Sequence, residues 1–66
     1  MTKEMKFFIY LLIFYSEYKG KSATDILNNW NKLNITDKIF SNYELYHIES
    51  LENAFKDIDI MTKRNA

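Results

Sequence analysis

His47 is the only histidine in the chain, and so the only imidazole that a reaction near neutral pH could use. A catalytic histidine works as a base on a serine or cysteine nucleophile, or it binds a metal ion. The chain has no cysteine and no serine-hydrolase motif. We therefore predict no catalytic residues, and we expect His47 to be a polar residue at the edge of a helix, hydrogen-bonded or solvated.

Two carboxylates flank an isoleucine in Asp57-Ile58-Asp59. Paired carboxylates can bind a metal ion or carry out acid–base chemistry. Residues two apart on a helix point about 200° away from one another, so these two aspartates cannot share one site on a regular helix. We expect two solvated side chains on either side of a buried Ile58. The alternative is that they form salt bridges with a basic partner.

The tyrosines are the third group of candidate functional residues, and two roles remain open for them. Tyrosine rings pack at the edge of a core with the hydroxyl in water, or they anchor a protein interface. Stacking on nucleic-acid bases is disfavoured because no basic residues alternate with the rings. The tyrosines considered are Tyr10, Tyr15, Tyr18, Tyr43 and Tyr46. The candidate partner-binding residues are Tyr10, Tyr18, Tyr43, Tyr46, His47, Asp57 and Asp59.

The composition excludes several classes of site. Without cysteine there is no disulfide or thiolate zinc site, and no glycine-rich phosphate loop or metal-ligand spacing is present, so no cofactor and no metal are predicted. Nine basic and nine acidic residues leave no net charge, which disfavours non-specific nucleic-acid binding and electrostatic attachment to a membrane. A helix-turn-helix through Asn34 is disfavoured because the would-be recognition helix is acidic.

Four helices are expected to position these residues, at 2–19, 23–33, 35–48 and 51–63. Thr2, Ser22, Thr36 and Ser50 stand where N-caps are expected, while Gly20 and Asn34 suit left-handed turn positions. No stretch of strict alternation predicts a strand. The sequence thus predicts an all-α fold, a compact bundle of three to four short helices, with a single domain over residues 1–66.

The first helix is apolar around most of its circumference. Its run at residues 7–15 is shorter than the roughly 20 residues that span a bilayer, and no small-residue cleavage site follows it. We expect a buried helix, no membrane role and a cytoplasmic location. Lys3, Lys6, Tyr10 and Glu17 share one narrow sector. Such a helix is the central element of a fold or is partly docked on a partner.

Six short sequence elements are spaced along the chain. They are Lys3-Glu4, the aromatic-aliphatic run at 7–15 followed by Tyr18-Lys19, the Ser22 turn, Trp30-Asn31-Lys32, Tyr43-Glu44 with His47, and Asp57-Ile58-Asp59. Together they resemble a family of short bacterial helical proteins described only as a domain of unknown function, and the last two elements are the most specific. The family usually has phenylalanine in place of Trp30, glycine in place of Asn34 and Ser50, and leucine in place of Tyr46. Its members are often encoded beside, or fused to, ADP-ribosyltransferase-like proteins, which implies a toxin–antitoxin or defence module with the small protein as regulator.

The chain is so small that it buries only about 60% of its unfolded surface, so dense packing, self-association or a tight complex must stabilise it. We predict a non-enzymatic protein-binding regulator, antitoxin-like or an accessory partner of a larger bacterial or phage enzyme, that acts by occlusion. Its partner would be an ADP-ribosyltransferase-like toxin or a nuclease. The alternatives are a phage-encoded inhibitor of a host defence nuclease and a self-assembling structural homodimer with the first helix at its core.

Overall fold

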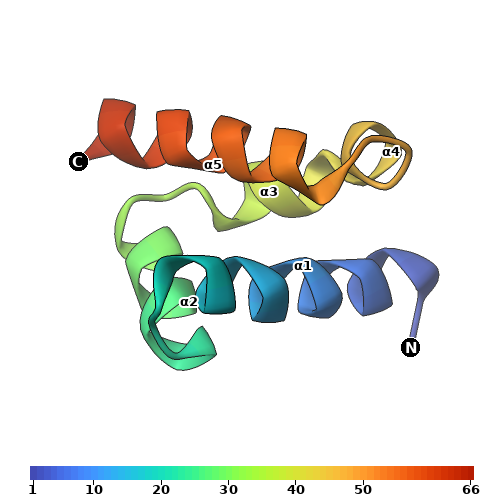
Figure 1. The fold of residues 1–66 in the computed structure, drawn as a ribbon, viewed down its shortest axis with the longest axis horizontal. Helices are drawn as coiled ribbons and strands as arrows, with labels where there is room; N and C mark the ends of the chain where they lie inside the picture. Colours follow the sequence, from blue (N-terminus) through green and yellow to red (C-terminus); the bar gives the residue numbers. More distant parts are fainter.

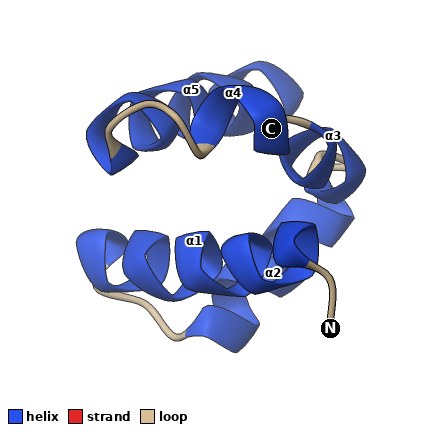
Figure 2. Ribbon diagram, turned by 90° about the vertical axis from the view of Figure 1, so that its right-hand side faces the viewer, coloured by secondary structure: helices blue, strands red, loops and turns tan.

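A computed structural model describes residues 1–66 as helices joined by short turns, without a strand (Figures 1 and 2). The helices are α1 (Lys3–Lys19), α2 (Ala23–Lys32), α3 (Thr36–Ser41), α4 (Tyr43–Tyr46) and α5 (Leu51–Asn65). The all-α prediction is confirmed. The radius of gyration is 10.9 Å, close to the roughly 11 Å of a compact chain of this length.

The helices form two layers (Figures 1 and 2). One layer contains α1 and α2, and the other contains α3, α4 and α5. After α1 the chain turns into α2, and α3 and α4 then lead it back toward the N-terminal end of α1. From there α5 runs in the same direction as α1 (Figure 1). This course brings α4 close to the N-terminal half of α1, where the rings of Phe7 and Tyr43 meet edge to face.

The helix ends follow from local chemistry. Three hydroxyl side chains cap helices as predicted, each accepting a hydrogen bond from the backbone N–H three residues later: Thr2 from Met5 at 3.1 Å, Ser22 from Asp25 at 3.1 Å and Ser50 from Asn53 at 3.4 Å. Gly20 ends α1 at φ 68°, and Asn34 takes φ 60° after α2. Both left-handed turns match the prediction.

The third expected helix, at 35–48, was wrong in its extent. The chain forms α3 and α4 instead, because Asn42 leaves the helical conformation at ψ 17° and serves as both the C-cap of α3 and the N-cap of α4. The expected bundle of three to four helices therefore has five segments. Thr36 is not a cap either, since its hydroxyl donates a hydrogen bond to the Asn31 side chain at 2.5 Å.

The core is built around Trp30 of α2, which is fully buried. Its ring lies 5.9 Å from that of Phe8 and 5.6 Å from that of Tyr15, both on α1. Tyr15 in turn meets Phe55 of α5 edge to face at 5.5 Å. The predicted stripes of α2 and α5 enter this core, with Ile26, Ala54 and Ile58 buried. Tyr15 thus contacts aromatic rings in both layers.

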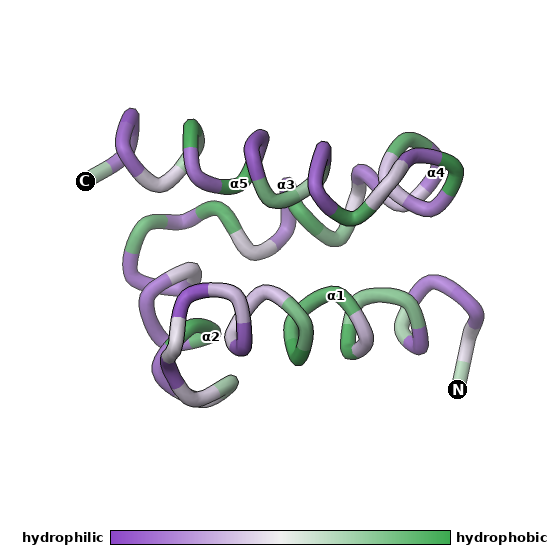
Figure 3. The backbone as a smooth tube through the Cα atoms, in the orientation of Figure 1, coloured by the Kyte–Doolittle hydropathy of each residue, from purple (hydrophilic) through white to green (hydrophobic).

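α1 is apolar along much of its length (Figure 3), and its apolar side chains lie on two sides of the helix. One side supplies Phe8, Leu11, Leu12 and Tyr15 to the core. The opposite side leaves large apolar side chains in solvent, with Ile9 37%, Tyr10 46%, Ile13 44% and Phe14 41% exposed. None of the helices combines the length and apolar content needed to cross a bilayer.

Candidate protein-binding site

The Asp57-Ile58-Asp59 segment ties α5 to two other helices. Ile58 is fully buried, as expected. The two aspartates, however, are not simply solvated: both are half-buried, and each accepts a hydrogen bond from a buried tyrosine. The expectation of two solvated side chains was wrong for two reasons. Tyr15, which reaches Asp59, is distant in sequence, and Tyr46, which reaches Asp57, lies on the helix that follows the break at Asn42.

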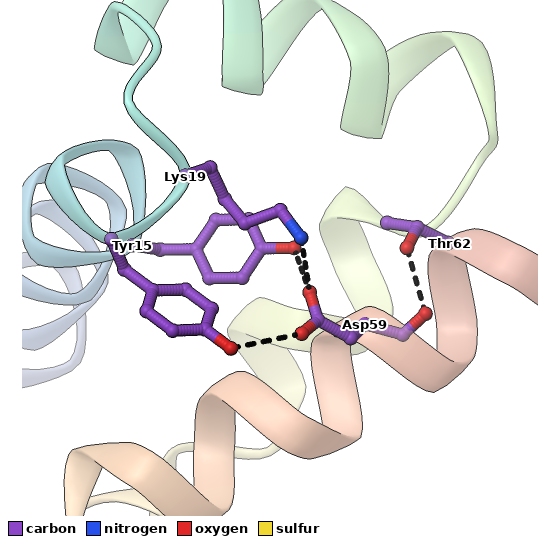
Figure 4. Close-up of polar contacts among 5 residues, drawn as sticks. Tyr15, Lys19, Asp59 and Thr62 are labelled. Atoms are coloured by element: carbon purple, nitrogen blue, oxygen red, sulfur yellow. Dashed lines mark hydrogen bonds and ion pairs between the residues drawn. The ribbon is translucent and has the colours of Figure 1, made fainter.

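Asp59 is satisfied within the chain (Figure 4). Its Oδ1 accepts a hydrogen bond from the Tyr15 hydroxyl at 2.5 Å and pairs with Lys19 Nζ at 3.2 Å. The Tyr18 hydroxyl lies 3.5 Å from Oδ2. The Lys19–Asp59 pair is partly exposed, so it adds less than about 1 kcal/mol of stability. Asp59 therefore connects α5 to the C-terminal end of α1.

Asp57 keeps one oxygen free. Its Oδ2 accepts a hydrogen bond from the Tyr46 hydroxyl, which in turn accepts one from Asn42 Nδ2 at 3.2 Å. No hydrogen bond within the chain reaches Oδ1. The Tyr46 bond orients the carboxylate, and Oδ1 can still accept a hydrogen bond from a partner.

Both tyrosine hydroxyls are held in the neutral form. Burial away from water raises the pKa of Tyr15 and of Tyr46 above the usual 10.0, and the hydrogen bonds to Asp59 and Asp57 raise it further. Neither tyrosine can therefore release a proton near neutral pH. At neutral pH both act as hydrogen-bond donors that position a carboxylate.

A groove of about 450 Å³ runs between α4 and α5, where Asp57 lies. Leu45 and Ile60 contribute exposed apolar side chains, 51% and 47% accessible. The full lining is Leu45, Tyr46, Glu49, Asn53, Lys56, Asp57 and Ile60. Carboxylates beside apolar surface suit an arginine or lysine side chain, whose stem is apolar and whose head is cationic. We call this surface the α4–α5 groove.

Two other hollows are simpler. One of about 390 Å³ is lined by Tyr18, Glu52, Phe55 and Lys56, and one of about 160 Å³ is lined by the polar Asn31, Asn34, Thr36 and Asp37. Neither gathers two carboxylates. No group of three or more histidine, cysteine, aspartate or glutamate side chains lies close enough together to hold a metal ion.

His47 lies outside all three hollows. Its exposed ring stacks on Tyr43 with the centroids 4.2 Å apart, and Nδ1 lies 2.7 Å from the Tyr43 carbonyl oxygen. This hydrogen-bonded position at the end of α4 is the one expected. No hydrogen bond or ion pair joins His47 to Asp57 or Asp59, so the structure does not assemble an acid–base pair from them.

The seven candidate residues fall into separate places. Tyr46 and Asp57 meet in the α4–α5 groove, Tyr18 and Asp59 meet where α1 passes α5, Tyr43 and His47 stack beside Phe7, and Tyr10 lies on the outer side of α1 against Phe14. Sequence reasoning missed Leu45, Glu49 and Ile60 in the groove. Ile60 carried a signal, because it is apolar yet lies off the buried stripe of α5.

Comparison with known proteins gives one match. A family model described as "Protein of unknown function (DUF3791)" matches residues 6–65, a range that includes both specific elements, Tyr43-Glu44 with His47 and Asp57-Ile58-Asp59. Searches of curated proteins and of solved structures found no match.

Proposed function

The chain belongs to the DUF3791 family of proteins of unknown function, and we propose that it is a non-enzymatic regulator that binds a larger protein through the α4–α5 groove. The observation that carries this proposal is the free Oδ1 of Asp57 in a groove that Glu49 and the exposed Leu45 and Ile60 also line. An arginine or lysine of the partner fits there, with its stem against the apolar pair and its head on the carboxylates.

Hydrogen bonds within the chain already hold the carboxylates of the α4–α5 groove in place before a partner binds, which favours a high affinity for the partner. The Tyr46 hydrogen bond holds the Asp57 carboxylate in place, and Asn53 Nδ2 donates to Glu49 Oε2 at 3.2 Å. Side chains that are already ordered lose less conformational entropy when a partner binds. Lys56 also lines the groove and partly offsets its negative charge, so a partner must bring apolar contact as well as a cation.

The resemblance described above supports an ADP-ribosyltransferase-like enzyme of a bacterium or phage as the partner. Arginine and lysine side chains are common ligands of phosphate groups, and a dinucleotide substrate carries two such groups. A carboxylate groove that occupies one of those side chains would keep the dinucleotide out. The mechanism proposed is therefore occlusion of a basic substrate site.

The test is capture of the partner with matched variants. Affinity-tagged wild-type chain, the double variant E49Q/D57N and the control E44Q are each incubated with lysate of the native host, and bound proteins are quantified by mass spectrometry. We expect the wild type and E44Q to capture the same enzyme in equal amounts. E49Q/D57N is expected to capture at least about tenfold less of it, because two charge-assisted hydrogen bonds to the partner are weakened.

The amide variants preserve shape, and the amide oxygen at position 57 can still accept the Tyr46 bond. Thermal melts followed by circular dichroism check that the fold is kept. Equal capture by E49Q/D57N and wild type would contradict the groove as the binding site. Full activity of the captured enzyme at saturating wild-type chain would contradict occlusion.

A further inference from the structure

The outer side of α1 carries a repeat of its own. Lys6, Tyr10, Ile13 and Glu17 follow one another at spacings of four, three and four, and all four are exposed. This spacing is that of the a and d positions along the seam of a coiled coil. Ile9 and Phe14 flank the seam, one on each side, and are 37% and 41% exposed. We call these six residues the α1 outer face.

The charged residues of the α1 outer face are placed so that they can pair with those of the same face on a second copy of the chain. Lys6 and Glu17 lie equally far from the midpoint of the seam, between Leu11 and Leu12, and so do Tyr10 and Ile13. Two copies of α1 that cross this midpoint in opposite directions would place Lys6 of each level with Glu17 of the other. Tyr10 of each would be level with Ile13 of the other. A parallel pair would instead set Lys6 against Lys6 and Glu17 against Glu17.

We propose that the α1 outer face binds a second copy of this chain, with the two α1 helices antiparallel about a two-fold axis. Such an interface is isologous, because each copy offers the same patch to the other. The apolar centre of the seam supplies the burial, and the two Lys6–Glu17 pairs at its ends select the antiparallel direction. A seam of about two heptads is smaller than a standard interface, so we expect an association in the micromolar range.

The dimer is independent of the α4–α5 groove, which belongs to the other layer of the molecule (Figure 2). One dimer would present two grooves to its partners. Loss of the dimer and loss of partner capture therefore test different surfaces.

Crosslinking tests the register directly. Lys6 and Glu17 are about 16 Å apart along their own helix, so a zero-length carbodiimide crosslink between them must join two chains. We expect the purified full chain to shift from monomer to dimer in sedimentation velocity between about 1 μM and 1 mM. Tryptic mass spectrometry of the crosslinked dimer is expected to contain the Lys6–Glu17 linkage.

Charge reversal gives the second arm. K6E alone and E17K alone each create two like-charge contacts and are expected to weaken association about tenfold, whereas K38E on α3 should not. The double variant K6E/E17K restores both pairs in the opposite sense and is expected to regain dimerisation. So is an equimolar mixture of the two single variants.

A chain that stays monomeric across the concentration range overturns the proposal. So does a dimer whose crosslinks lack the Lys6–Glu17 linkage, or a double variant that associates as weakly as the single ones.

Discussion

At the scale of single residues, the two aspartates of Asp57-Ile58-Asp59 differ in what remains open to a partner. Asp59 has Tyr15, Lys19 and Tyr18 around it, while Asp57 has only Tyr46. A hydrogen bond to a carboxylate contributes about 1.5–3 kcal/mol, so both aspartates are also part of what holds α5 in place. Asp57 thus combines a structural bond with a free acceptor.

The tyrosine–aspartate bonds predict a loss of stability in alkaline solution. Because the pKa of Tyr15 and of Tyr46 is raised on folding, their stabilising contribution is complete below pH 10.0, the unfolded value, and falls as the pH rises above it. Each tyrosine should remove about 1.4 kcal/mol of unfolding free energy per pH unit there. Urea titrations from pH 8 to pH 11 measure this slope.

Y15F and Y46F serve as the matched variants. Each should be less stable than wild type by about 1.5–3 kcal/mol at pH 8, because an aspartate loses a donor, and each should lose less stability between pH 10 and pH 11. Y10F removes a hydroxyl that makes no hydrogen bond and should leave the midpoint at pH 8 unchanged. An alkaline slope that is the same in Y15F, Y46F and wild type would assign the loss to other groups.

At the scale of the helices, the ends were predictable and the break at Asn42 was not. Thr2, Ser22 and Ser50 cap their helices through contacts three residues along the chain, so the local sequence contains the whole interaction. The apolar period through Ile35, Ile39 and Tyr46 continues across Asn42, and all three residues are buried. The apolar pattern therefore gives no sign of the break. At Asn42 the chain changes direction, but the same apolar residues still face the core.

The two left-handed turns differ in their tolerance of substitution. G20A should destabilise the chain by about 1 kcal/mol, because alanine is strained at φ 68°. No heavy atom lies within 4 Å of the added Cβ, so the cost comes from the backbone alone. N34G should be near neutral, since glycine adopts φ 60° readily.

Thermal unfolding followed by circular dichroism measures both variants. A change of 1 kcal/mol corresponds to a shift in Tm of about 4–8 °C for a domain of this size. A G20A variant that melts with wild type would show that the turn between α1 and α2 can relax out of the left-handed conformation.

At the scale of the whole molecule, a core of twelve buried apolar residues is centred on Trp30. Its indole Nε1 is buried without a hydrogen-bond partner. An unpaired buried N–H costs about 1–3 kcal/mol, so Trp30 stabilises the core less than its size implies. A phenylalanine at this position would avoid that cost.

W30F should therefore destabilise the chain by only about 1 kcal/mol, because removal of the unpaired N–H offsets much of the lost packing. W30A creates a cavity, costs about 3–5 kcal/mol and should leave a chain this small largely unfolded at 25 °C. Urea unfolding followed by far-UV circular dichroism compares the two variants. A W30F variant as unstable as W30A would mean that the indole fills its space too closely to be replaced.

The sequence alone determined the helical class, most helix ends and the stripes of α2 and α5, because caps and periodicity act over a few residues. Family membership also followed from spaced residues. The functions proposed for the α4–α5 groove and the α1 outer face remain predictions.

Only the tertiary structure decided which carboxylates are occupied and which side of α1 is covered. Tyr15 meets Asp59 across 44 positions of sequence and Tyr46 meets Asp57 across 11, distances over which no local pattern acts. The polar sector of Lys3, Lys6 and Glu17 marks one exposed side of α1, but the rest of the helix is apolar, so its own residues could not select which of the remaining sides is buried. That choice was made by where α2 and α5 place Trp30 and Phe55.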